Sequence, residues 1–201
     1  MNEKQLEIIK DKIKVYRSRL ASEKRRFGGY FDNSGIRYII PELYLKLGDY
    51  KGAIAYFRWF SREFPNDIGL PFFNLFWSFT FFKNKRGKDA IRLAYKTAFQ
   101  NTYLLDLICN RPVECIDKLE IWGHESVGYA KEVAEWCNKL LTNDFRTWIS
   151  GLIETGEFST NMSRFISLQK LLKDETAVKL RSKLLAEISL FEKQLTERDD
   201  D

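Results

Sequence analysis

The side chains best suited to chemistry are one histidine and three cysteines: His124, Cys109, Cys115 and Cys137. Imidazole and thiolate groups are common zinc ligands, and a cysteine paired with a histidine can act as a nucleophile. Zinc sites usually contain closely spaced pairs such as C-x2-C or H-x3-H, and the sequence has neither. No neighbouring residue in the sequence would activate any of the thiols. We therefore expect buried structural cysteines and no metal site.

Other catalytic patterns are also missing from the sequence. It contains no glycine-rich phosphate loop after a strand, no G-x-S-x-G and no H-E-x-x-H. Pairs of acids such as Asp117 and Glu120 are three residues apart, which places them on a solvated face of a predicted helix. We expect a protein without catalytic residues and without a cofactor. An enzyme built on His124 and a cysteine is the least favoured class.

The positive charge is concentrated at the N-terminus. The net charge is +5, and residues 1–27, with nine Lys/Arg and four Asp/Glu, account for all of it. Two interpretations stay open: a packing helix with a solvated basic side, or a surface for nucleic acid or an acidic partner. Interleaved acids and the lack of a nucleic-acid-binding motif favour packing. The basic surface would consist of Lys10, Lys14, Arg17, Arg25 and Arg26.

Residues 34–67 form the most informative stretch, since they predict two helices joined by a tight turn at Gly48 and Asp49. Asp49 is a good N-cap, and aromatic and small residues recur every three to four positions until Pro65. Pro41 lies inside the first helix, where a proline removes one hydrogen bond. That helix therefore either begins near Pro41 or is kinked there.

Further helices follow at 71–83 and 88–100. The second carries Ala90, Ala94 and Ala98 at a spacing of four, which lets two helix backbones approach closely. We expect more divergent hairpins over 101–154. These comprise a short helix near 104–109, a helical stretch after Pro112, and a third hairpin formed by a helix after Ser126 and a helix over 144–154. A linker at 156–159 would precede two helices over 160–197, the last of which caps the stack, and an acidic, frayed tail would follow at 197–201.

Composition places the chain among folded proteins of a reducing compartment. Three irregularly spaced cysteines argue against a disulfide framework, and no basic-then-apolar leader begins the sequence. The most apolar run, 68–82, is shorter than the roughly 18–20 residues that span a bilayer. We expect a cytoplasmic protein with no membrane segment.

Two blocks carry a resemblance to known families. GIRYIIPELYLKLGDYKGAIAYFRWFSREFPNDIG, at 35–69, resembles a tetratricopeptide repeat, although Arg37, Pro41 and Phe60 depart from that pattern. The block 98–149, with AFQNTYLLDLI, WGHESVGYA and EWCNKLLTNDFRTWI, resembles the tail of the suppressor of tumorigenicity seven family. In that family the middle element has the form G-D-S-E-A-x-x-Y-A, so His124 replaces an acid here, and Val127 and Gly128 replace the E-A pair.

The resemblance implies an all-α, tetratricopeptide-like stack of antiparallel hairpins with a basic N-terminal helix and a capping C-terminal helix. We expect one domain over 1–201, divided into 1–29, 34–67, 71–100, 101–154 and 160–197. In tetratricopeptide folds, ligands bind the concave surface formed by the first helix of each hairpin. Those positions correspond here to Tyr38, Glu42, Leu45, Lys46, Phe72, Leu75, Phe79, Phe82 and Lys83. The alternative, that these are core residues, stays open.

The expected function is therefore a non-catalytic scaffold or adaptor that binds another protein or peptide. The alternative is a nucleic-acid-associated or regulatory protein that acts through the basic helix 1–27. The sequence leaves open both the partner and whether the chain forms a homo-oligomer.

Overall fold

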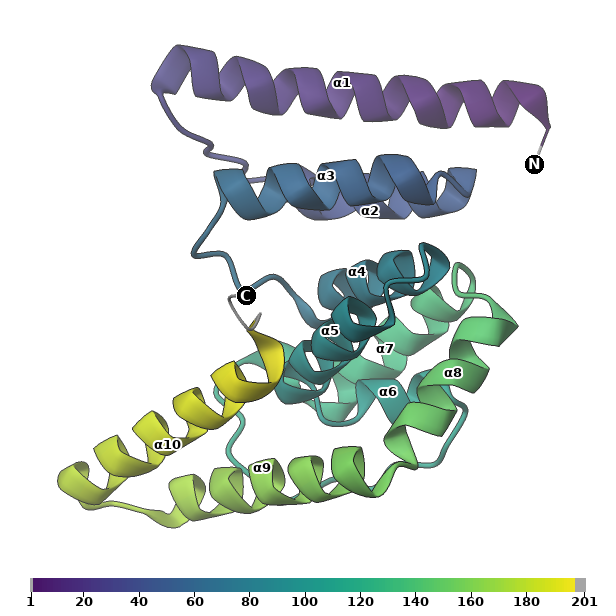
Figure 1. Ribbon diagram of the computed structural model, residues 1–201. Coiled ribbons are helices and arrows are strands. Elements are labelled where there is room, and N and C mark those ends of the chain that lie inside the picture. The colour runs from purple at the N-terminus through teal and green to yellow at the C-terminus, as the bar shows by residue number, and fades with distance from the viewer. Residues whose placement is uncertain (1, 198–201) are drawn as a thin grey trace.

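The computed structural model describes residues 2–197, and all the regular structure in this range is helical, as expected (Figure 1). The predicted tail over 197–201 lies almost wholly outside the described residues. The helices are α1 (Glu3–Phe27), α2 (Ile36–Leu47), α3 (Tyr50–Glu63), α4 (Pro71–Lys83), α5 (Gly87–Gln100), α6 (Leu104–Ile108), the 3-10 turn η1 (Gly123–Glu125), α7 (Val127–Asn138), α8 (Asn143–Ile153), α9 (Gly156–Asp174) and α10 (Val178–Thr196).

The first helix, α1, lies along the outside of α2 (Figure 1). Its start is capped by Asn2, whose side chain accepts a hydrogen bond from the Gln5 amide at 2.9 Å. It ends at Gly28, which has the left-handed conformation that glycine adopts at low cost (φ 73°). Ile13 and Leu20 on its inner face are buried. α1 therefore packs on α2 through its inner face.

The hairpin of α2 and α3 follows the sequence signals closely. Gly48 takes a left-handed conformation at the turn, and the Asp49 carboxylate caps α3 by accepting a hydrogen bond from the Gly52 amide at 2.8 Å. Gly52 has no room for a side chain, because a Cβ there would overlap the capping carboxylate and come within 2.6 Å of the Tyr44 ring. The turn thus requires both the acid and the small residue.

Pro41 lies inside α2, which begins five residues earlier at Ile36, so the helix does not start at the proline. Pro41 has no amide hydrogen to donate to the carbonyl of Arg37, one turn earlier. The hydroxyl of Tyr56 on α3 donates to that carbonyl instead, at 2.8 Å. Tyr56 is completely buried, and burial raises the pKa of its hydroxyl, which keeps the donor proton in place. The neighbouring helix therefore satisfies the group that the proline leaves unpaired.

The next hairpin, α4 and α5, forms the centre of the molecule. Pro71 is the first residue of α4, a position where its missing amide hydrogen costs nothing. α4 is apolar on all sides and packs against α2, α3 and α5, so that it is covered all round, as its composition predicts. Ala90, Ala94 and Ala98 are buried, and the Ser78 hydroxyl donates to the Ala90 carbonyl at 2.7 Å. The alanine row does allow a close approach.

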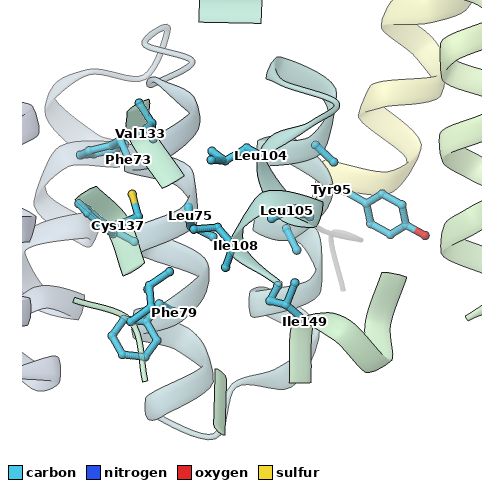
Figure 2. Close-up of a cluster of buried hydrophobic side chains, with 14 of the residues drawn as sticks. Phe73, Leu75, Phe79, Tyr95, Leu104, Leu105, Ile108, Val133, Cys137 and Ile149 are labelled. Atoms are coloured by element: carbon cyan, nitrogen blue, oxygen red, sulfur yellow. The ribbon is translucent and has the colours of Figure 1, made fainter. Parts of the chain in front are cut away.

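The chain from α6 to α8 departs from the expected hairpins. Residues 111–122 form no α-helix, so the helical stretch predicted after Pro112 is wrong. α7 and α8 contact each other less than each contacts α6, so they are not the paired third hairpin that the sequence suggests. Side chains of α4, α6, α7 and α8 meet instead in one core, where Leu75, Ile108 and Cys137 lie close together (Figure 2).

The last two helices, α9 and α10, form a long hairpin (Figure 1). The linker predicted at 156–159 is wrong, because the Thr155 hydroxyl accepts a hydrogen bond from the Phe158 amide and starts α9 there. α10 returns to the middle of the chain and packs on α5, with the rings of Phe99 and Phe191 6.0 Å apart. No helix within residues 2–197 combines the length and the apolar character needed to cross a membrane.

Candidate functional site

The predicted concave surface is not an open groove. Leu45, Leu75 and Phe79 are 6%, 0% and 0% exposed, so they belong to the core and cannot meet a ligand. Figure 2 shows Leu75 and Phe79 among the buried side chains. The prediction that these three face a ligand is wrong. The alternative drawn from the sequence, that they are core residues, describes them correctly.

The aromatic and basic positions of α4 are covered by the chain's own later helices. Trp136 of α7 packs its ring 5.0 Å from Phe72, and Phe145 of α8 lies 5.4 Å from Phe82. Lys83 pairs with Asp144 at the start of α8, at 2.8 Å. α7 and α8 therefore cover the positions on α4 that the sequence predicted to face a ligand.

Tyr38, the first of the predicted positions on α2, is part of an internal polar network. Its hydroxyl donates to the Asp67 carboxylate at 2.7 Å, and burial together with that carboxylate raises the pKa of Tyr38 to about 12. Although burial acts to raise the pKa of Asp67, hydrogen bonds from Tyr38, the Gly69 amide and Arg37 hold it below its usual value. This network fixes the loop between α3 and α4.

Glu42 and Lys46, the remaining predicted positions, pair with each other at 2.5 Å. Glu42 also accepts a hydrogen bond from the Trp136 indole at 3.4 Å. Only Lys46 of the nine predicted residues is mainly exposed. A ligand here would find one charged side chain and no groove.

The basic residues of α1 are largely engaged within the chain. Lys10 pairs with Glu7 at 3.4 Å and Lys14 with Asp11 at 3.1 Å. Arg17 donates to the Tyr44 hydroxyl at 3.1 Å. Arg25 is exposed, and the Arg26 guanidinium lies over the Phe27 ring. The surface therefore alternates in sign along the helix.

The cysteines and the histidine are dispersed. Cys137 is buried in the core, Cys109 is half-buried and Cys115 is exposed. Burial raises the pKa of the Cys109 thiol to about 11, which disfavours the reactive thiolate. Among residues 2–197 no three His, Cys, Asp or Glu side chains lie close enough together to hold a metal ion.

The structure has instead an open cavity that the sequence did not indicate. It has a volume of about 740 Å³ and lies between α3, α4 and α5 on one side and the C-terminal half of α10 on the other. Its lining contains five Lys or Arg, three Glu and several aromatic rings. The lining includes Arg58, Lys96, Trp122, Ser189, Glu192 and Lys193.

The wall formed by α3 and α5 is basic. Arg86 and Arg92 both pair with Asp89, whereas Arg58 and Lys96 have no ion pair within residues 2–197. Burial lowers the pKa of the Lys96 ammonium group, and among the charges of residues 2–197 only Asp67 acts against this. Lys96 is thus a half-buried cation that has no direct counter-ion within the described part of the chain.

The opposite wall, formed by α10 and the segment before α7, is of mixed charge. Glu192 is half-buried, and burial raises the pKa of its carboxyl group. Lys193 lies beside it and forms no ion pair in the described part of the chain. Glu125 is engaged, because its carboxylate accepts hydrogen bonds from the amides of Ile121 and Trp122.

A weak signal for this cavity exists in the sequence. Arg92, Lys96 and Gln100 recur every four residues on α5, which places them on one side of the helix, opposite the alanine row. The partner wall lies about ninety residues later in α10. Nothing in the local pattern connects the two.

Comparisons with known protein families, with curated proteins and with solved structures find no match to this chain.

Proposed function

We propose that the chain is a non-catalytic, tetratricopeptide-like scaffold that binds a segment of another protein in the cavity between α5 and α10. The stacking supports the tetratricopeptide-like part of the proposal, because α4 packs on both helices of the preceding hairpin, as neighbouring units do in helical solenoids. The binding surface is then not the inner face of α2 and α4, which α7 and α8 cover.

The observation that carries the proposal is the cavity itself. Its volume of about 740 Å³ lies in the range of about 300–1,000 Å³ that is usual for small-molecule pockets. Apolar rings and convergent charged groups line it together, a combination typical of recognition sites. Trp122 at its rim is 63% exposed, and aromatic side chains of this kind are frequent anchors in protein interfaces.

A steric block tests the proposal. Ser189 is an exposed residue of α10 that lines the cavity, so Ser189→Trp fills the space without removing a core contact. Ser182→Trp, also exposed on α10 but outside the cavity lining, is the matched control. Wild-type and variant chains are used as baits in quantitative affinity purification, and each recovered protein is then titrated in purified form.

We expect the wild type and Ser182→Trp to bind the same partner and Ser189→Trp to lose it. Equal binding by all three chains would refute the cavity as the site. Circular dichroism of the three chains confirms that each is folded before the comparison.

A further inference from the structure

We infer that the segment bound in this cavity is acidic, with its carboxylates facing Arg58 and Lys96 on the wall formed by α3 and α5. This inference depends on the proposed function, since it names the chemistry of the ligand at the same site. It adds the charge of the ligand, which the shape of the cavity does not determine.

Charge is the first argument. Arg58, Lys96 and Lys193 line the cavity without an ion pair in residues 2–197, while the other two cations of the lining share Asp89. The three glutamates of the lining belong to the facing wall, and Glu125 is already hydrogen-bonded to two backbone amides. The wall formed by α3 and α5 therefore presents a positive field to a segment that enters.

Desolvation is the second argument. A buried ammonium group without a counter-ion is costly, and a carboxylate placed beside it removes that cost and adds a charge-assisted hydrogen bond. Lys96 lies one turn before Gln100, whose side-chain amide donates to the carbonyls of Ile68 and Gly69. α5 is thus held against the loop between α3 and α4, which positions the backbone that carries Lys96.

A substitution of Glu192 should have the opposite effect on ligand binding to a substitution of Lys96. Its carboxyl group lies on the α10 wall of the same cavity and forms no hydrogen bond with the described part of the chain. When it is ionised, it repels an acidic ligand. Removing the charge of Lys96 should therefore weaken binding, whereas removing the charge of Glu192 should strengthen it.

Neither substitution threatens the fold. Lys96→Met keeps most of the length of the side chain and removes a desolvated charge, and Glu192→Gln keeps the shape of the carboxyl group. Lys179→Met is the control, because Lys179 is exposed on α10 and does not line the cavity.

The probe is a fluorescein-labelled hexapeptide, Glu-Glu-Phe-Glu-Glu-Phe, compared with versions in which Gln or Lys replaces Glu. Fluorescence anisotropy is measured with the full chain at about 50 mM and about 300 mM salt, which changes the screening length about 2.4-fold. We expect the acidic peptide to bind about tenfold more tightly than the Gln version at low salt, and the difference to shrink at high salt. Lys96→Met should weaken its binding by about five- to tenfold, Glu192→Gln should strengthen it by about threefold, and Lys179→Met should leave it unchanged.

Equal affinity for the acidic and Gln peptides, or changes of the same sign in Lys96→Met and Glu192→Gln, would overturn the inference. If Ser189→Trp abolishes partner binding while these two substitutions have no effect, the cavity remains the site and only its acidic specificity is wrong. A single-stranded oligonucleotide serves as competitor. If the oligonucleotide displaces the labelled peptide at a lower concentration than the unlabelled peptide does, the cationic wall prefers phosphates. That result would overturn the proposal of an acidic peptide ligand.

Discussion

Tyr56→Phe tests whether the Tyr56 hydroxyl on α3 replaces the hydrogen bond that Pro41 cannot make in α2. The substitution removes one oxygen from a completely buried ring and leaves its packing unchanged. The Arg37 carbonyl then loses its 2.8 Å hydrogen bond, and Pro41 cannot replace the donor because it has no amide hydrogen.

The expected cost follows from that lost bond. Leaving a buried acceptor without a partner costs about 1–3 kcal/mol, and the half-buried position of Arg37 favours the lower part, about 1–2 kcal/mol. For a chain of about 200 residues this lowers Tm by about 3–6 °C. Pro41→Ala restores an amide hydrogen in register with the Arg37 carbonyl. In the double variant Tyr56→Phe/Pro41→Ala the loss should therefore be about 1 kcal/mol smaller than the sum of the single losses.

Urea denaturation followed by circular dichroism at 222 nm gives the four free energies of unfolding. Tyr95→Phe is the control, since its hydroxyl accepts a hydrogen bond from the Asn161 side chain, far from the proline. Its effect should add to that of Pro41→Ala. If the losses of Tyr56→Phe and Pro41→Ala also add to within about 0.3 kcal/mol, the Tyr56 hydroxyl does not compensate for the proline.

Three further predictions concern stability. Gly52→Ala should destabilise the fold by about 1–3 kcal/mol, because the new methyl group overlaps the capping carboxylate. Gly151→Ala is the control: it lies in open space on α8 and should be neutral or stabilise the fold by up to about 1 kcal/mol. Thermal melts of the two variants distinguish the cost of steric overlap from the effect of helix propensity. The hydrogen bond from Lys24 lowers the pKa of Glu63 from 4.5 to about 2. This carboxylate therefore stabilises the folded state above about pH 4.5 and loses that contribution as the pH falls towards 2. The urea midpoint should drop less between about pH 5 and about pH 3 in Glu63→Gln than in the wild type. Thr155→Ala should cost about 1 kcal/mol because it removes the N-cap of α9, and no loss of Tm would contradict the cap.

The first half of the chain could be predicted from the sequence because its signals are local. Asp49 caps α3 and Pro71 begins α4, as expected, and α5 begins at Gly87, one residue before the predicted start. The alanine row of α5 predicted a close helix contact from spacing alone. In each case the deciding interaction lies within one or two turns of helix.

The later half was less predictable because its structure depends on distant contacts. The segment 111–122 has enough apolar residues for a helix, yet it runs as an irregular connection, and Tyr103 holds it through a hydrogen bond from the Ile116 amide. Thr155 does not stand out as a cap in the sequence because Gly156 follows it, and a glycine next to a turn residue suggests a linker.

The candidate site could not be predicted for the same reason. Whether Phe79 faces a ligand or a core depends on the placement of Phe145, and the sequence offers no rule that sets α8 over α4. The cavity needs α5 and α10 together. Only the tertiary structure brings Lys96 and Glu192 to facing walls of the same cavity.

The docking of α10 on α5 has a consequence for how the chain folds and tolerates shortening. In an open solenoid each unit touches only its neighbours, so units can be removed from one end with local effects. Here the last helix closes on the middle of the chain, which raises the contact order and joins early and late segments into one cooperative unit. Truncation before α10 would remove Phe191 from the Phe99 ring and should lower the stability of the α4–α5 hairpin as well as that of the C-terminal end.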